Sequence, residues 1–208
     1  MRRVAWFLSA WLVVASLLSA CQATKVDAPP SEGLRQYVGE GFSLQLPANA
    51  WLEVGPTERV PAGATRIVGP QIWIKPGDAD WSYRGAAYEL EIRTYDNPAG
   101  LDVETWARDY ILTTWQRAVA QGEPAMGPPV SEDGVIFEDR VGRATVAGQA
   151  AFRADFFAGD SYRRTFFLVK GARVVALSFY DYPVGNQPLA SVQQDVYELL
   201  LSTFRWKE

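Results

Sequence analysis

Several segments carry apolar side chains on both sides of an extended chain, and this feature constrains the fold most. Alternate residues of a strand point to opposite faces. Both sets of positions are apolar in two segments: Ala151, Phe152, Ala154, Phe156 and Phe157 in the first, and Val174, Val175, Ala176, Leu177 and Phe179 in the second. A sheet built from such strands must be covered on both faces. These segments therefore exclude a sheet that leaves one whole face in water.

Two segments with helical periodicity can supply that cover. Apolar residues over 103–119 recur at spacings of three and four, with Asp102 as the expected N-cap and Gly122 as the expected stop. A similar pattern over 189–200 predicts a final helix, with Asn186 near its start. One helix for each face predicts an α+β fold, a three-layer α-β-α sandwich with a mostly antiparallel sheet flanked by two amphipathic helices.

The remaining strands follow from alternation and from turn residues. Strict alternation predicts a strand over 41–46, and 51–54 is interpreted as its hairpin partner. Residues 66–75 predict one strand, bulged near Gly69, and 76–85 a polar loop. Further strands are expected over 86–95, 135–157, 161–170 and 173–180. Because the connections 158–161 and 170–173 are short, the last of these strands should form antiparallel hairpins.

The first residues have the pattern of an export signal. Arg2 and Arg3 precede a run without charge that ends at residue 20, which is the layout of a secretory signal peptide. Leu18-Ser19-Ala20-Cys21 resembles the bacterial lipobox. That resemblance implies cleavage before Cys21, a diacylglycerol on its thiol and acylation, for example by palmitate, of the new amine. Because two or more acyl chains anchor a protein stably, we expect an extracytoplasmic protein held at a membrane by lipid.

This interpretation divides the chain into a signal peptide (1–20), the lipidated Cys21 with a flexible tether (21–36) and one domain (37–208). Gln22 after the cysteine resembles the outer-membrane sorting signal of enteric-type bacteria. An uncleaved transmembrane helix and a secreted protein with a stray cysteine are the alternatives. The uncharged run is slightly short for the first, since a spanning helix needs about 20 residues.

Composition excludes several classes of chemistry. The chain of 208 residues has no histidine and one cysteine, which excludes Ser-His-Asp and Cys-His catalysis, imidazole metal sites and an internal disulfide. Without Arg2 and Arg3 the chain has 18 basic and 24 acidic groups, a net charge of −6. An acidic domain is a poor partner for nucleic acid or for a flat anionic membrane. Neither a metal nor a cofactor is expected beyond the covalent lipid.

The order of elements, together with several short motifs, resembles the Mog/PsbP-like superfamily. The motifs are Tyr37-x₃-Gly41-Phe-Ser-Leu-Gln-Leu-Pro47 followed by Trp51, the helix start Val103 to Trp106, Val146-x-Gly148-x-x-Ala151, the aromatic hairpin Tyr162 to Tyr180, and Ser202-Thr-Phe204. They span nearly all of the mature chain, and none is a catalytic signature. The resemblance implies the PsbP-like fold and a noncatalytic binding or assembly subunit, with a protein partner in the cell envelope.

An aromatic segment over 73–88 suggests a binding loop. Its candidate ligand-binding residues are Trp81, Tyr83, Asp80 and Arg84. Stacked rings beside opposite charges are suited to a glycan or an extended peptide, so a glycan-binding or small-ligand-binding protein is the alternative function. In the simpler interpretation Trp73 and Tyr88 belong to the core, because large aromatic side chains usually bury most of their area.

Two charged patterns in the expected strands remain. Glu89, Glu91 and Arg93 share one strand face, which suits either a carboxylate-type hydrolase or, more simply, a ladder of ion pairs. Arg163 and Arg164 alternate, so they point to opposite faces, each toward an ion-pair partner of its own.

Overall fold

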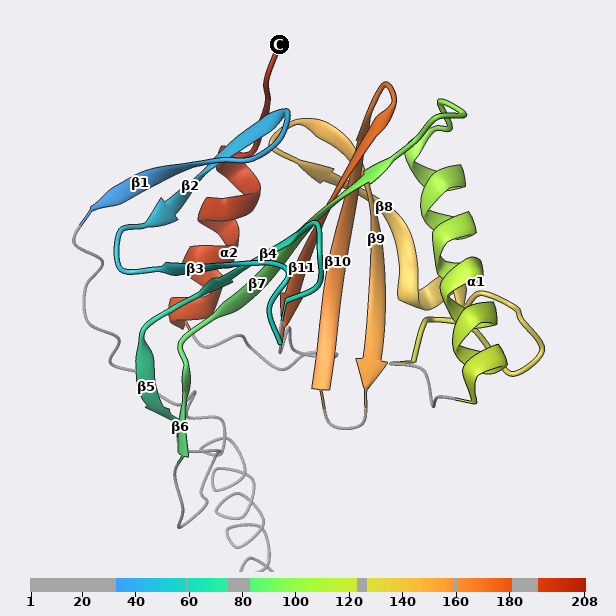
Figure 1. Ribbon diagram of the computed structural model, residues 1–208, viewed down its shortest axis with the longest axis horizontal. Coiled ribbons are helices and arrows are strands. Elements are labelled where there is room, and N and C mark those ends of the chain that lie inside the picture. Colours follow the sequence, from blue (N-terminus) through green and yellow to red (C-terminus); the bar gives the residue numbers. More distant parts are fainter. Residues whose placement is uncertain (1–32, 59, 75–82, 123–126, 159–160, 181–190) are drawn as a thin grey trace, which may run out of the picture.

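The computed structural model describes residues 33–58, 60–74, 83–122, 127–158, 161–180 and 191–208 (Figure 1). Every strand pair in these residues is antiparallel, and two α-helices accompany the sheets. The chain therefore has an α+β fold with mostly antiparallel sheet, which confirms the fold class predicted from the sequence.

The main sheet has seven strands in the order β3-β4-β7-β11-β10-β9-β8. Their bounds are Trp51–Val54 (β3), Ala64–Val68 (β4), Glu89–Asp96 (β7), Arg173–Tyr180 (β11), Ser161–Lys170 (β10), Gln149–Ala158 (β9) and Val141–Val146 (β8). The hairpins expected at the connections 158–161 and 170–173 are present, since β9, β10 and β11 pair in chain order. The segment predicted as one or two strands over 135–157 is two strands, β8 and β9, and the first begins only at Val141. Strand β7 then joins the far edge of β11, although it precedes this meander in the sequence.

Two smaller sheets complete the described strands. One has the order β1-β2-β12, with bounds Leu34–Val38, Phe42–Pro47 and Arg205–Trp206, and the other pairs β5 (Gln71–Ile74) with β6 (Tyr83–Ala86). Strand β1 begins at Leu34, three residues before the predicted start of the domain at Tyr37.

The predicted pairing of 51–54 with 41–46 was wrong. Both edges of β2 are taken, by β1 and by β12, so β3 pairs with β4 in the main sheet instead. The single strand predicted over 66–75 is two strands, β4 and β5, which Gly69 and Pro70 separate. The pairing keeps one register across this break, since Gly69 donates its N–H to the Tyr88 carbonyl and Ala87 donates its N–H to the Pro70 carbonyl. Proline itself has no N–H to donate.

Both helices lie where periodicity placed them. Helix α1 (Val103–Gln121) begins after Asp102, whose carboxylate accepts the N–H groups of Glu104 and Thr105, and ends at Gly122 with a φ of 65°. Helix α2 (Ser191–Thr203) closes the chain before β12, and the expected start at Asn186 lies outside the described residues. A short 3₁₀ turn, Glu138–Arg140, precedes β8. Neither described helix has the combination of length and hydropathy that crossing a bilayer requires.

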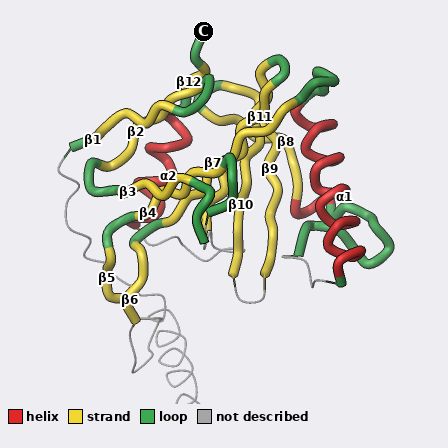
Figure 2. Tube along the Cα trace, viewed as in Figure 1, coloured by secondary structure: helices red, strands yellow, loops and turns green. Residues whose placement is uncertain are grey.

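The buried residues form two clusters that use alternate positions of the same strands. One contains Leu168, Val175 and Leu177 with residues of α2 and β2, and the other contains Phe167 and Ala176 with Ala107 and Ile111 of α1. Helix α2 packs against β2, and α1 packs against β9 and β10 (Figure 2). The apolar character of both strand faces is thereby used, as the sequence predicted.

Candidate functional site

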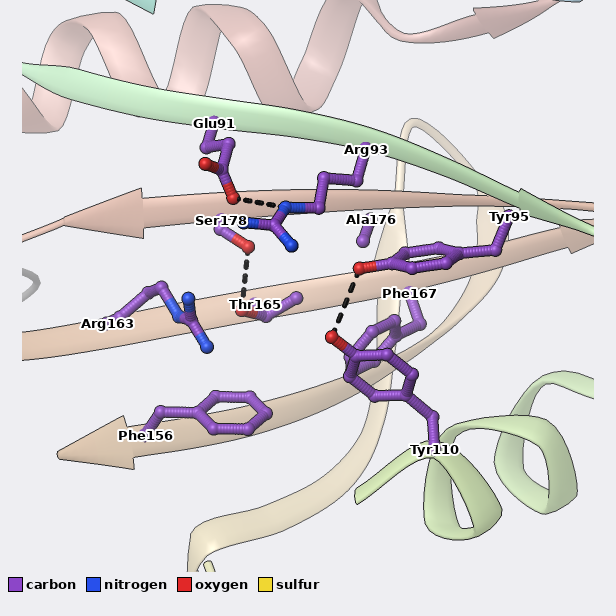
Figure 3. Close-up of a pocket in the computed structure, with 10 residues that line it drawn as sticks. All are labelled: Glu91, Arg93, Tyr95, Tyr110, Phe156, Arg163, Thr165, Phe167, Ala176 and Ser178. Atoms are coloured by element: carbon purple, nitrogen blue, oxygen red, sulfur yellow. Dashed lines mark hydrogen bonds and ion pairs between the residues drawn. The ribbon is translucent and has the colours of Figure 1, made fainter. Parts of the chain in front are cut away.

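A small pocket opens on the face of the main sheet that α1 partly covers. Its described lining residues are Glu91, Arg93 and Tyr95 of β7, Ala176 and Ser178 of β11, Arg163, Thr165 and Phe167 of β10, Phe156 of β9 and Tyr110 of α1 (Figure 3). The side chains on this face are apolar where α1 packs against the sheet and polar beyond the helix. The pocket lies at this boundary.

Strand register brings the polar residues together. Residues directly opposite each other on antiparallel strands point to the same face. Glu91 is opposite Ser178, and Ser178 is opposite Thr165, so these three form one row across the three central strands of the sheet. Arg163 is opposite Phe156 in the neighbouring row.

A buried ion pair forms one wall of the pocket. The Nε group of Arg93 donates to a carboxylate oxygen of Glu91 at 2.7 Å, and the Glu91 side chain is only 5% exposed. Burial alone would lower the pKa of Arg93, but the hydrogen bond and the charge of Glu91 outweigh it and leave that pKa raised. Arg93 therefore stays charged and compensates the buried carboxylate.

Two pairs of hydroxyl groups form the floor and one side. Thr165 and Ser178 share a hydrogen bond of 2.9 Å between their hydroxyl oxygens, and Tyr95 and Tyr110 share one of 3.1 Å that ties β7 to α1. Burial first, and then Tyr110, raises the pKa of Tyr95, so its phenol stays protonated at neutral pH. Each pair consumes one hydroxyl hydrogen internally and leaves a second one to donate elsewhere.

Arg163 lines the pocket beside Phe156. Its guanidinium carbon lies 4.6 Å from the centre of the Phe156 ring, which is a cation–π contact. Its Nε is buried and has no hydrogen-bond partner among the residues that the structure describes. Within the described part of the chain, Arg163 has no ion pair with a carboxylate.

Arg163 and Arg164 do point to opposite faces, as their alternation predicted. Arg164 forms the expected ion pair, because it donates to both carboxylate oxygens of Asp155 at 2.8 and 3.0 Å. Arg163 faces Phe156 instead of an acidic residue across β9 and β10, because the register places a phenyl ring opposite it. The partner expected for Arg163 is thus missing from the described residues.

A second group of ion pairs lies beside the pocket on β3, β4 and β7. Arg66 donates to Glu89 at 2.7 Å and contacts Glu53 at 3.3 Å. Glu89, Glu91 and Arg93 share one face, as predicted, and each of the two carboxylates binds an arginine. These contacts form the ladder of ion pairs that was the simpler interpretation of the sequence pattern.

The ligand-binding residues predicted from the aromatic loop lie away from this pocket or outside the described residues. Asp80 and Trp81 lie outside the described residues, as does Cys21. Tyr83 and Arg84 belong to strand β6, which pairs with β5, so the loop predicted over 76–85 ends earlier than expected. None of these four candidates is among the described residues that line the pocket. Tyr88 is 2% exposed and belongs to the core.

Sequence reasoning marked Glu91, Arg93 and Arg163 separately and missed the hydroxyl residues Thr165, Ser178, Tyr95 and Tyr110. Alternation assigns each of them to a strand or helix face. That Glu91, Ser178 and Thr165 form one row follows only from the strand order and register. Both depend on pairing between segments that are far apart in the sequence. In the described residues, no three acidic or cysteine side chains gather in a way that could hold a metal ion.

The chain matches no protein-family profile and no curated protein sequence. A crystal structure of a protein from Bacteroides thetaiotaomicron VPI-5482 is similar to it with a TM-score of 0.45 and 12% sequence identity. The alignment covers 83% of this chain and 48% of that one, so this chain spans about half the length of that protein. A likeness this distant carries no argument about fold or function.

Proposed function

We propose that the protein is an extracytoplasmic lipoprotein, anchored through Cys21, whose domain is a noncatalytic binding or assembly module of the cell envelope. The lipobox-like Leu18-Ser19-Ala20-Cys21 supports the anchor. The proposal includes a PsbP-like three-layer α-β-α sandwich, in which α1 and α2 flank the main sheet. The two separate core clusters, one with each helix, support that arrangement.

The pocket at Glu91, Arg93 and Arg163 is the observation that carries the binding role. Keeping two arginines and a buried carboxylate on a sheet face costs free energy, since charges lose hydration there. An apolar set of side chains under α1 would cover the same strands without that cost. The partner surface of the proposal is therefore the polar part of this face: the pocket and the ion pairs of Glu53, Arg66 and Glu89.

In-cell photocrosslinking tests this proposal. Glu53 lies on the edge strand β3, and its side chain is 31% exposed. A photoreactive amino acid at position 53 should crosslink a specific envelope protein, identified by mass spectrometry, and Cys21→Ser should abolish both membrane attachment and that crosslink. The matched control is the same amino acid at Gln149, which is exposed at the start of β9.

Two results would contradict the proposal. If position 53 yields no product, or the same products as position 149, the polar face is not a binding surface. If Cys21→Ser is still processed and held at the membrane as before, the lipid anchor is wrong.

A further inference from the structure

We propose that the pocket binds a carboxylate group of the partner and that Arg163 is its principal donor. This inference rests on the proposed function and names the chemistry that the same face recognises. The inference involves binding alone and no chemical step, because the pocket is a small space surrounded by hydrogen-bond donors.

The pocket has an excess of donors. Among the lining residues that the structure describes, the charged ones are Glu91, Arg93 and Arg163, a net charge of +1, and the carboxylate among them is already bound by Arg93. An arginine has five N–H donors and no acceptor, and each hydroxyl pair described above leaves one O–H over. A ligand that accepts hydrogen bonds and carries negative charge satisfies this set.

Arg163 is positioned to make the decisive contact. The Phe156 ring lies against its guanidinium (Figure 3), and Tyr180, which is opposite Arg163 on β11, also interacts with that group. Within the described ranges the buried Nε lacks a partner, and an unsatisfied buried donor costs about 1–3 kcal/mol. A carboxylate can accept from Nε and a neighbouring N–H together, in the two-bond geometry that guanidinium groups favour. Binding would remove that cost.

The size of the pocket favours a carboxylate at the end of a larger molecule. The enclosed part of the pocket has room for about one water molecule, and the space of about 230 Å³ around it includes open solvent. Pockets that hold whole small-molecule ligands measure roughly 300–1,000 Å³, far more than this enclosed part. One oxygen of a flat carboxylate fits the enclosed part, whereas a tetrahedral phosphate is bulkier. The rest of the ligand would lie outside, on the polar face.

Titration of the full-length protein, extracted in neutral detergent, with sodium acetate tests the assignment. Acetate should produce a saturable shift of the Arg163 Nε–H resonance in nitrogen-15 NMR spectra, because burial slows exchange of that hydrogen with water. Acetamide has nearly the same shape without the charge, so it should produce no saturable shift. Inorganic phosphate should bind more weakly than acetate.

Three variants separate a direct contact from general charge effects. Arg163→Gln should weaken acetate binding at least tenfold, followed through backbone amides around the pocket. Arg163→Lys keeps the charge but loses the planar guanidinium that can donate two parallel hydrogen bonds. Its affinity for acetate should therefore lie between those of Arg163→Gln and the wild type. Arg117→Gln, at an exposed position of α1, should leave the affinity unchanged. Thermal melts check that each variant is folded.

Three outcomes overturn the inference: acetate does not saturate, Arg163→Gln binds acetate as the wild type does, or phosphate binds more tightly than acetate. Crosslinking at position 53 distinguishes failure of the carboxylate site from failure of the proposed binding or assembly role. A crosslink without acetate binding overturns the carboxylate site alone. Acetate binding without a crosslink supports the site and contradicts the envelope protein as partner.

Discussion

Glu91 is the most deeply buried charged side chain in the pocket, and its environment makes it sensitive to substitution. Its carboxylate lies in one row with the Ser178 and Thr165 hydroxyls and meets Arg93 at 2.7 Å. Removing one member of a buried pair leaves the other charge without compensation. The alternation of residues 89–93 predicted that Glu91 and Arg93 share a face. Their burial depends on Ser178 and Thr165, which come from strands far along the chain.

We expect Glu91→Gln to lower the free energy of unfolding by about 1–3 kcal/mol, because an amide faces a half-buried guanidinium. Denaturation by urea measures the change. Glu89→Gln is the matched control: Glu89 is 24% exposed, and its partner Arg66 keeps Glu53. The control should lose about 1 kcal/mol or less. Equal losses would show that the burial of Glu91 has no energetic consequence.

Helix α1 shows how much a single element takes from local sequence. Its start is fixed by Asp102, which accepts two backbone N–H groups and the Thr105 hydroxyl, and its end by Gly122 in the left-handed conformation. Both caps were predicted, because capping depends on residues within a few positions of the helix end. The pairing of β3 was not predictable in this way, because its partner was chosen by competition among distant strands.

The cap predicts a pH-dependent contribution to stability. Hydrogen bonds from the Thr105 hydroxyl and then from backbone N–H groups lower the pKa of Asp102. A lowered pKa in the folded state stabilises the fold above the unfolded-state pKa of about 3.9, and that contribution is lost as the pH falls through the folded-state pKa. Asp102→Ala should therefore lower the Tm at pH 7 by about 2–4 °C.

Asp102→Asn is the informative comparison, since asparagine also caps helices but does not titrate there. Thermal melts at several pH values should show a higher Tm for the wild type than for Asp102→Asn at pH 7. The difference in Tm should shrink as the pH falls below the unfolded-state pKa of about 3.9 and through the lowered folded-state pKa. A gap that stays constant with pH would contradict the role of the ionised carboxylate.

At the scale of the whole molecule, one sheet connects two cores. Leu200 of α2 and Ile111 of α1 are both fully buried, in different clusters. Alternate residues of β10 and β11 belong to the two clusters. If one cluster came apart, these strands would therefore be exposed on that side and the other cluster would lose its support. The domain should therefore unfold as a unit.

We expect Leu200→Ala and Ile111→Ala each to cost about 2–5 kcal/mol, the usual range for a buried aliphatic side chain. Each variant should keep a single transition, with circular dichroism and tryptophan fluorescence coinciding. The double variant should lose nearly the sum of the two, because the sites lie in separate clusters. Two transitions in either variant would show that the helices protect independent cores.

The sequence by itself determined the local structure: both helices, the caps of α1, the hairpins at 158–161 and 170–173 and the two apolar faces of the central strands. Those features follow from residue spacing, which fixes side-chain direction within one element. Tertiary structure decided which strands became neighbours, and therefore that β3 joins β4 and that Glu91, Ser178, Thr165 and Arg163 form one pocket. Pairing order and register depend on burial summed over the whole chain, so no single segment contains the information that assembles the site.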